Sequence, residues 1–113
     1  MPKEFNLQTG KLGEEIAKEF LEKKGYGIIE QNHKTKYGEI DLLANYGKET
    51  VLIEVRTKIG EDFGTPEESL TKKKLRKLWF NAQTAKATRI DAVCIVLKPD
   101  KTVERLEHYE NII

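Results

Sequence analysis

The chain has 113 residues, 38% of them hydrophobic, with 20 Lys and Arg against 19 Asp and Glu, which is typical of one globular domain, here expected to span residues 1–113. No stretch approaches the roughly 18 apolar residues of a membrane span, and the first residues lack the apolar run of a signal peptide, so we expect a cytoplasmic protein without a membrane partner. The single cysteine, Cys94, excludes internal disulfides and cysteine-cluster zinc sites, and is expected to be an inert buried thiol.

The first predicted element is an amphipathic helix over residues 10–24, which Gly25 ends. Its apolar residues recur at helical spacing: Leu12, Ile16, Ala17, Phe20 and Leu21. At about 100° per residue, Glu14 falls at the edge of the apolar stripe, whereas Glu15, Glu19 and Glu22 point away from it. Glu14 is therefore the helix carboxylate that we expect to face the body of the protein.

Three strands are predicted next, at residues 26–32, 37–44 and 50–58, the last alternating apolar and polar residues. The short connection at 45–49 is rich in turn residues, which predicts that the second and third strands form an antiparallel hairpin. If the hairpin is centred on Gly47 and Lys48, the numbers of paired residues sum to 95. Asp41 then lies directly opposite Glu54.

The second half of the chain predicts a short capped helix at 65–68, a longer helix at 71–87, a fully covered strand at 90–97 and a last strand at 103–108. The longer helix is expected to turn these residues inward: Leu75, Leu78, Trp79, Ala82 and Ala85. The order αβββαβ, with a further β at the end, predicts an α/β (α+β) fold with a mixed sheet flanked by helices.

The pair of facing carboxylates carries the chemical argument. Like charges placed opposite each other on a sheet are destabilising, and a bound divalent cation would offset that cost. Mg²⁺ prefers carboxylate oxygens together with water and phosphate oxygens, and Arg56 and Lys58 follow Glu54 on the same strand face, where they would hold a phosphate. The alternative is an ordinary solvated ladder of charges, which would leave the third carboxylate, Glu14, unexplained.

Five segments carry a resemblance to a known family: GKLGEEIA at 10–17, GEIDLLA at 38–44, IEVRTK at 53–58, FGTP at 63–66 and RID at 89–91. In this order they resemble the YraN family, also called UPF0102, which is assigned to the restriction-endonuclease-like superfamily of PD-(D/E)xK nucleases, near the archaeal Holliday junction resolvases. The resemblance implies a central hairpin at which Asp41 and Glu54 hold Mg²⁺ or Mn²⁺, with Glu14 matching the helix glutamate of the resolvases.

The motif lysine is replaced by Arg56 in this sequence. Arginine stays protonated and cannot act as a general base, but it can bind a phosphate oxygen or stabilise negative charge in a transition state. Lys58, two residues further on the same face, is the candidate substitute. We therefore expect the replacement to affect catalytic turnover more than phosphate binding.

A net charge of +1 hides an uneven distribution. Residues 72–89 hold seven basic and no acidic residues, so this segment carries +7 and the rest of the chain −6. Most of these cations fall in the first turns of the second long helix: Lys72, Lys73, Lys74, Arg76 and Lys77. We expect them to contact nucleic acid, with Lys34 and Lys36 extending the surface; the alternative is a solvated helix face.

The leading hypothesis is a magnesium-dependent endonuclease acting on DNA, including branched or damaged DNA, with Glu14, Asp41, Glu54, Arg56 and Lys58 in its site. The alternatives are a non-catalytic nucleic-acid-binding protein of the same fold and an assembly domain. A homodimer is expected by analogy with the resolvases.

Several remaining residues receive structural interpretations. Trp79 and Phe80 are expected to pack in the core or at its rim, the alternative being platforms on which bases stack, and His33 and His108 have no partner in the sequence pattern. Asp91, at the head of the covered strand, is either a fourth acidic group of the site or a cap.

Overall fold

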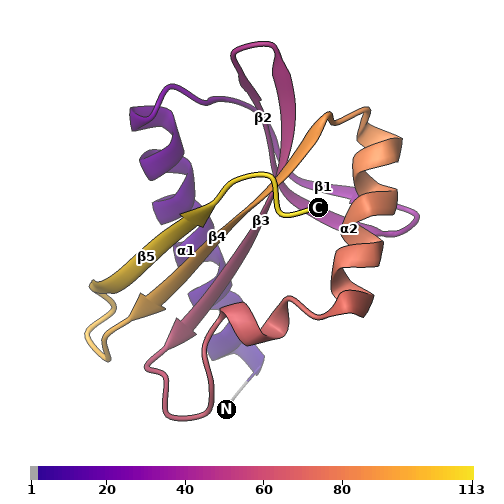
Figure 1. The fold of residues 1–113 in the computed structure, drawn as a ribbon. Helices are drawn as coiled ribbons and strands as arrows, with labels where there is room; N and C mark the ends of the chain where they lie inside the picture. The colour runs from indigo at the N-terminus through magenta and orange to yellow at the C-terminus, as the bar shows by residue number, and fades with distance from the viewer. Residues whose placement is uncertain (1–2) are drawn as a thin grey trace.

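A computed structural model describes the backbone of residues 3–113 and the side chains from residue 8 onward (Figure 1). Two helices, one 3₁₀ turn and five strands follow in the order α1 (Lys3–Lys23), β1 (Gly27–Thr35), β2 (Gly38–Tyr46), β3 (Glu49–Ile59), η1 (Glu67–Ser69), α2 (Lys72–Ala85), β4 (Arg89–Leu97) and β5 (Val103–Tyr109). Among the described residues, no helix combines the length and the apolar character that crossing a membrane requires.

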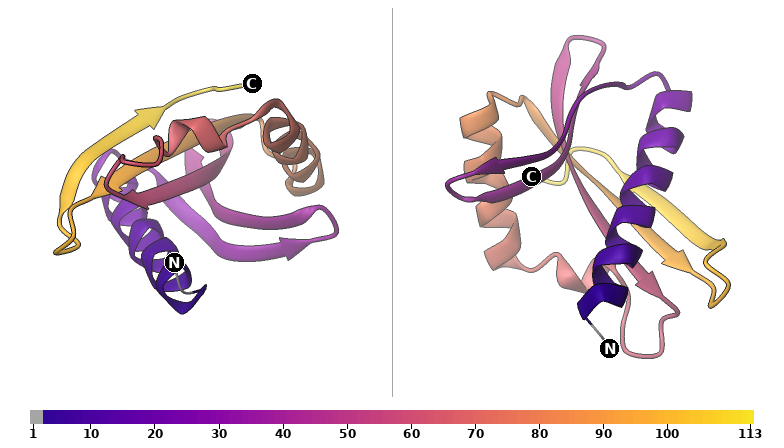
Figure 2. Two further views of the ribbon diagram at one scale, coloured as in Figure 1. Left: turned by 90° about the horizontal axis from the view of Figure 1, so that it is seen from below. Right: turned by 180° about the vertical axis from the view of Figure 1, so that it is seen from behind.

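The five strands form one sheet in the order β1-β2-β3-β4-β5. Only the β3–β4 pair is parallel, because α2 carries the chain across the sheet between these two strands. α1 covers one face of the sheet, while η1 and α2 lie on the other face (Figure 2). The predicted mixed sheet flanked by helices is confirmed, as is the covered strand, since residues 90–97 are all buried.

Each helix closes its own hydrophobic core against the sheet. Ala17 and Leu21 of α1 pack on alternate residues of β3 and β4, whereas Leu78 and Ala82 of α2 pack on the opposite face, against Leu52. β3 therefore runs between two hydrophobic cores. Val51, Ile53 and Val55 face the core under α1, and Leu52 faces the core under α2, as the alternation in the sequence predicts.

α1 approaches β3 unusually closely at Gly13. A Cβ atom added there would lie 1.8 Å from Oγ1 of Thr57, so no other residue fits without movement. α1 also begins well before residue 10, where the apolar periodicity begins. The close approach brings Glu14, the next residue, to the rim of the sheet.

α2 is capped by Thr71, whose side chain accepts a hydrogen bond from the Lys74 amide at 3.2 Å. The expectation that Trp79 turns inward is wrong, because its side chain is 45% exposed. Asn81 is buried instead and accepts a hydrogen bond from the Thr35 hydroxyl at the tip of the β1–β2 hairpin. The hairpin curls against α2, and this long-range contact sets which face of the helix is buried.

Candidate metal centre and nucleic-acid interface

The hairpin pairs as expected, since Leu42 lies opposite Ile53 and the paired residue numbers sum to 95. The regular pairing of β2 with β3 ends at this point. One residue further on, the Asp41 carboxylate accepts a hydrogen bond from the Val55 amide at 2.9 Å, in place of a strand carbonyl. Asp41 therefore lies where the two strands separate.

The Asp41 carboxyl has a pKa raised from 3.8 to about 8. Burial is the largest cause, followed by repulsion from Glu54, with a smaller contribution from Glu14. The hydrogen bond from Val55 opposes the shift but does not cancel it. Negative charge at this position is thus only partly compensated by the chain itself.

Glu54 is 2% exposed, and both of its cationic partners approach the same oxygen. Nη1 of Arg56 lies 3.3 Å and Nζ of Lys74 lies 3.1 Å from Oε2 of Glu54. Arg56 also donates from Nε to the Ser69 hydroxyl at 2.7 Å, which fixes the plane of its guanidinium. Lys58 instead directs its ammonium at the carbonyl oxygen of Phe63, at 3.4 Å.

A third carboxylate joins Asp41 and Glu14. Glu14, Glu39 and Asp41 each offer one oxygen, and these oxygens lie within 4.8 Å of one another. Asn32 bridges two of them, donating from Nδ2 to Glu14 at 2.8 Å and to Glu39 at 3.2 Å. Sequence reasoning missed Glu39, although it stands two residues before Asp41 on the same strand, a spacing that places both on one face.

A cleft of about 210 Å³ opens beside these groups. Residues from α1, β3 and the η1 region line it: Gly10, Glu14, Val55, Arg56, Thr57, Lys58, Pro66 and Ser69. Three of the candidate residues chosen from the sequence therefore meet in one cleft, and Asp41 and Glu54 lie next to it through their contacts with Val55 and Arg56. The chemical role of these residues stays a prediction.

The basic residues of segment 72–89 do not all lie on one surface in the structure. Lys72, Lys73, Arg76 and Lys77 are exposed along α2, where no acidic residue interrupts them. Lys74 turns toward Glu54 and contributes to the carboxylate site instead. Arg89, which belongs to β4, has a side chain only 16% exposed and is paired with Asp91.

Asp91 belongs to a separate polar cluster. Its carboxylate is fully buried and accepts hydrogen bonds from four partners, at 2.9 to 3.0 Å: Tyr26, Arg89, His108 and the Asn111 amide. These donors outweigh the burial and lower the pKa of Asp91 to about 2. Asp91 is therefore neither a member of the carboxylate site nor a simple cap.

The interpretation of His108 as a residue without a partner is wrong. Nε2 of His108 lies 2.9 Å from Asp91, and Nδ1 lies 2.7 Å from the Lys24 ammonium. An ammonium group only donates hydrogen bonds, so Nδ1 of His108 is the acceptor. Nε2 then carries the hydrogen and donates a hydrogen bond to the Asp91 carboxylate. Among the side chains that the structure describes, His33 by contrast pairs with the exposed Glu30 alone, at 3.0 Å.

Comparison with known proteins identifies relatives across most of the chain. A UPF0102 protein of Caldanaerobacter subterraneus is 40% identical over 96% of this chain and 98% of its own length. A UPF0102 protein of Pelotomaculum thermopropionicum is 37% identical over 90% of this chain and 92% of its own length. The model described as "Uncharacterised protein family UPF0102" matches residues 13–95, which include the hairpin, the basic helix and every residue that lines the cleft except Gly10. The chain belongs to the UPF0102 family.

Proposed function

We propose that this protein is a magnesium-dependent endonuclease-like protein that acts on the phosphodiester backbone of DNA. The observation that carries the proposal is the convergence of Glu14, Glu39 and Asp41 within 4.8 Å, combined with the raised pKa of the Asp41 carboxyl. The negative charge of three neighbouring carboxylates is only partly offset by donors of the chain, and a hard divalent cation, which prefers carboxylate oxygens, would offset the rest. If bound there, Mg²⁺ or Mn²⁺ would supply an activated water and would neutralise charge at a phosphate.

The chain's own residues divide the remaining tasks. Asp41, Glu14 and Glu39 would hold the ion, and Asn32 orients two of these carboxylates. Glu54, next to Asp41, would add a fourth oxygen if its partners yielded. Arg56 uses two of its five N–H donors in the described contacts, so it retains donors for a phosphate oxygen at the cleft.

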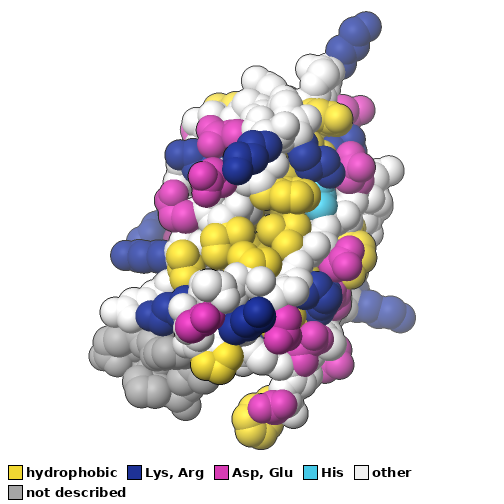
Figure 3. All heavy atoms as spheres, turned by 90° about the vertical axis from the view of Figure 1, so that its left-hand side faces the viewer, with side chains coloured by type: hydrophobic (Ala, Val, Ile, Leu, Met, Phe, Trp, Pro, Cys, Tyr) yellow, Lys and Arg dark blue, Asp and Glu magenta, His cyan; other side chains and the backbone are white. Residues whose placement is uncertain are grey.

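The exposed cations of α2 would bind the backbone of the nucleic acid. The face of the molecule formed around α1 and β5 mixes both signs of charge around a band of apolar side chains (Figure 3). α2 differs from it, because five of its fourteen residues are basic and none is acidic. A surface of one sign next to a carboxylate cleft is what a metal-dependent phosphodiesterase requires.

A second candidate function is nucleic-acid binding without turnover. The observation that favours it is that Glu54 and Ser69 hold Arg56 in the place of the motif lysine. Arginine stays protonated, so this side chain cannot accept the proton of an attacking water as a general base would. In this case the metal site and the basic helix would both bind their ligands, but no substrate would be cut.

Binding of Mn²⁺, followed by electron paramagnetic resonance, tests the metal site directly. We expect Asp41→Asn and Glu14→Gln to weaken Mn²⁺ binding by at least tenfold, and the matched variant Glu15→Gln, one residue along α1 and exposed, to leave it unchanged. Equal Mn²⁺ affinity in all four proteins would refute the site. Metal binding and DNA binding without cleavage of duplex, single-stranded or four-way-junction DNA would select the second candidate.

The basic helix is tested by salt dependence. Replacing Lys72, Lys73 and Lys77 by Gln should reduce the slope of log K against log salt by about 3 for duplex DNA. The control replaces Lys11, Lys18 and Lys23 of α1, where acidic residues are interspersed. An unchanged slope in the α2 variant would place the nucleic acid elsewhere.

A further inference from the structure

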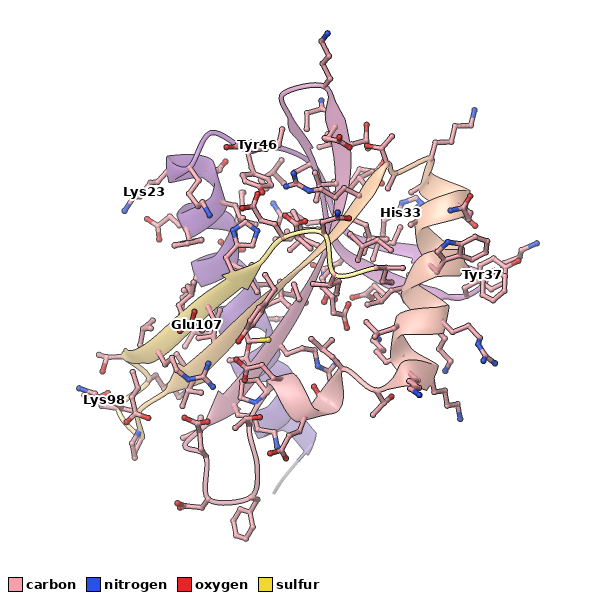
Figure 4. The ribbon with its side chains drawn as sticks, in the orientation of Figure 1. Lys23, His33, Tyr37, Tyr46, Lys98 and Glu107 are labelled. Atoms are coloured by element: carbon pink, nitrogen blue, oxygen red, sulfur yellow. The ribbon has the colours of Figure 1, made fainter. Side chains whose placement is uncertain are left out.

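Three aromatic side chains lie together on the surface at α2. Trp79 is 45%, Phe80 39% and Tyr37 38% exposed. The rings of Tyr37 and Phe80 stack with centroids 5.3 Å apart, and Trp79 meets Phe80 edge to face at 5.2 Å. Two of these residues come from α2 and one from the turn after β1, which lies beside α2 in Figure 4.

The cluster is held in place by hydrogen bonds that lead to one buried amide side chain. Asn81, 3% exposed, accepts a hydrogen bond from the Thr35 hydroxyl, and the same hydroxyl accepts one from the Tyr37 amide at 3.0 Å. The hairpin tip is thereby fastened to the helix that carries Phe80. The stacked rings are formed before any ligand arrives, which lowers the entropic cost of binding to them.

Cations surround this aromatic cluster. The Lys36 ammonium lies 5.2 Å from the centre of the Tyr37 ring, and Arg76 and Lys77 are exposed one turn before Phe80. α2 carries no acidic residue that would repel a phosphate. Exposed rings beside cations complement a ligand that offers both aromatic faces and negative charge, which is the chemistry of a nucleic-acid strand.

We propose that Tyr37, Trp79 and Phe80 stack against unpaired bases of the nucleic acid, so that the preferred substrate contains a single-stranded segment. This inference rests on the proposed function. Bases inside a duplex are already stacked on their neighbours, and only unpaired bases can use these rings. Phe80 follows Lys74 by six residues, a rise of about 9 Å, so the stacked bases would lie roughly two to three nucleotides from the carboxylate site.

Trp79 is the only tryptophan of the chain, so its fluorescence reports on the aromatic cluster alone. The experiment titrates the protein, in EDTA, with a short oligothymidylate, with an abasic deoxyribose-phosphate strand of equal length and with a blunt duplex. We expect the oligothymidylate to quench the fluorescence and to bind about tenfold more tightly than the abasic strand. Equal affinity for the two single strands would overturn the inference.

A second measurement uses variants and the anisotropy of labelled DNA. Phe80→Ala and Tyr37→Ala should each weaken oligothymidylate binding by about tenfold and leave duplex affinity unchanged, while Val103→Ala, which removes an exposed apolar side chain from β5, should alter neither. If Phe80→Ala changed the sedimentation mass of the protein instead, the cluster would be an interface between two copies and the inference would fail.

The two proposals fail in different ways. Duplex binding that requires Lys72 and Lys73 but shows no preference for strands with bases would overturn the stacking inference and leave the proposed function intact. Absence of binding to every nucleic acid tested would overturn both.

Discussion

Two aspartates inside the sheet, Asp41 on β2 and Asp91 on β4, have opposite pKa shifts. The pKa of Asp41 is raised to about 8, whereas that of Asp91 is lowered to about 2. Burial raises both, so the difference lies in the neighbours. Asp91 receives four donors, including the Arg89 guanidinium, while Asp41 receives one amide and faces Glu54 and Glu14.

This difference separates a carboxylate whose charge the fold compensates from one whose charge it does not. The charge of Asp91 is balanced by donors that the fold itself supplies, so a ligand would add nothing there. Asp41 lacks such donors, so its carboxyl group retains its proton up to a pH of about 8; under the proposed function, a bound cation would supply the missing compensation. Burial of a carboxyl group therefore does not by itself favour a binding site, whereas burial with too few donors is the pattern on which the proposed metal site rests.

The largest expected effect comes from removing the balanced charge. Asp91→Asn leaves Arg89 and His108 without their buried acceptor, so we expect the free energy of unfolding to fall by about 3–5 kcal/mol. Urea denaturation measures this loss. Mn²⁺ affinity of the folded variant should match the wild type, and a variant that kept its stability but lost Mn²⁺ would assign Asp91 to the metal site.

The two aspartates should also produce opposite pH dependences in the metal-free protein. Because the pKa of Asp91 is lowered, its contribution to stability is present above about pH 4 and is lost as the pH falls toward 2, at a cost of about 2 kcal/mol. Because the pKa of Asp41 is raised, its contribution is present below about pH 4 and is lost as the pH rises toward 8. Thermal unfolding across this range measures both.

Single variants separate these two effects. Asp41→Asn should remove the loss of stability between pH 4 and pH 8, and Asp91→Asn should reduce the acid-side loss. Glu67, whose pKa is also lowered to about 2 by hydrogen bonds from Arg105, accounts for part of the acid side and remains in both variants. If the stability of Asp41→Asn still fell between pH 4 and pH 8, the fall would come from another group, and the charge of Asp41 would be compensated within the fold.

The sequence could predict this contrast only in part. The pairing of β2 with β3, which brings Asp41 close to Glu54, follows from local features, namely a turn of known length and strand alternation. The partners of Asp91 could not be inferred in the same way, because Tyr26 and His108 are distant in sequence and meet it only after the sheet has formed.

The same limit applies to the candidate site. The inward position of Glu14 can be predicted from helical periodicity. The hydrogen bonds by which Asn32 bridges two carboxylates depend on a left-handed backbone, φ 50°, which no sequence pattern indicates. Lys74 was assigned to the nucleic-acid surface from its neighbours, and only the packing of α2 turns it toward Glu54. Local periodicity therefore predicts which residues face inward, and tertiary packing decides what they meet.

A smaller effect is expected when a side chain is added where α1 and β3 approach each other most closely. Gly13→Ala places a Cβ 1.8 Å from Thr57 Oγ1, so the helix must shift, and we expect a loss of about 1–3 kcal/mol in stability together with weaker Mn²⁺ binding, because Glu14 moves with the helix. Gly10→Ala is the matched control: nothing lies within 4 Å, and the change should stabilise α1 by about 1 kcal/mol. Equal effects of the two variants would remove the argument that close packing positions Glu14.

The smallest expected effect concerns Glu39, the carboxylate that the sequence did not single out. Glu39→Gln keeps the size of the side chain and its contact with Asn32 but removes one of the three charges that converge on the site. If Glu39 is a ligand, Mn²⁺ affinity should fall by about tenfold, measured by calorimetry with Glu30→Gln, on the preceding strand and paired only with His33, as the control. If the site instead consists of Asp41, Glu54 and Glu14, the affinity should fall by much less than tenfold, because Glu39 then contributes only its attraction to the cation from a distance and no bond. The size of the loss therefore decides which carboxylates bind the cation and which only lie near it.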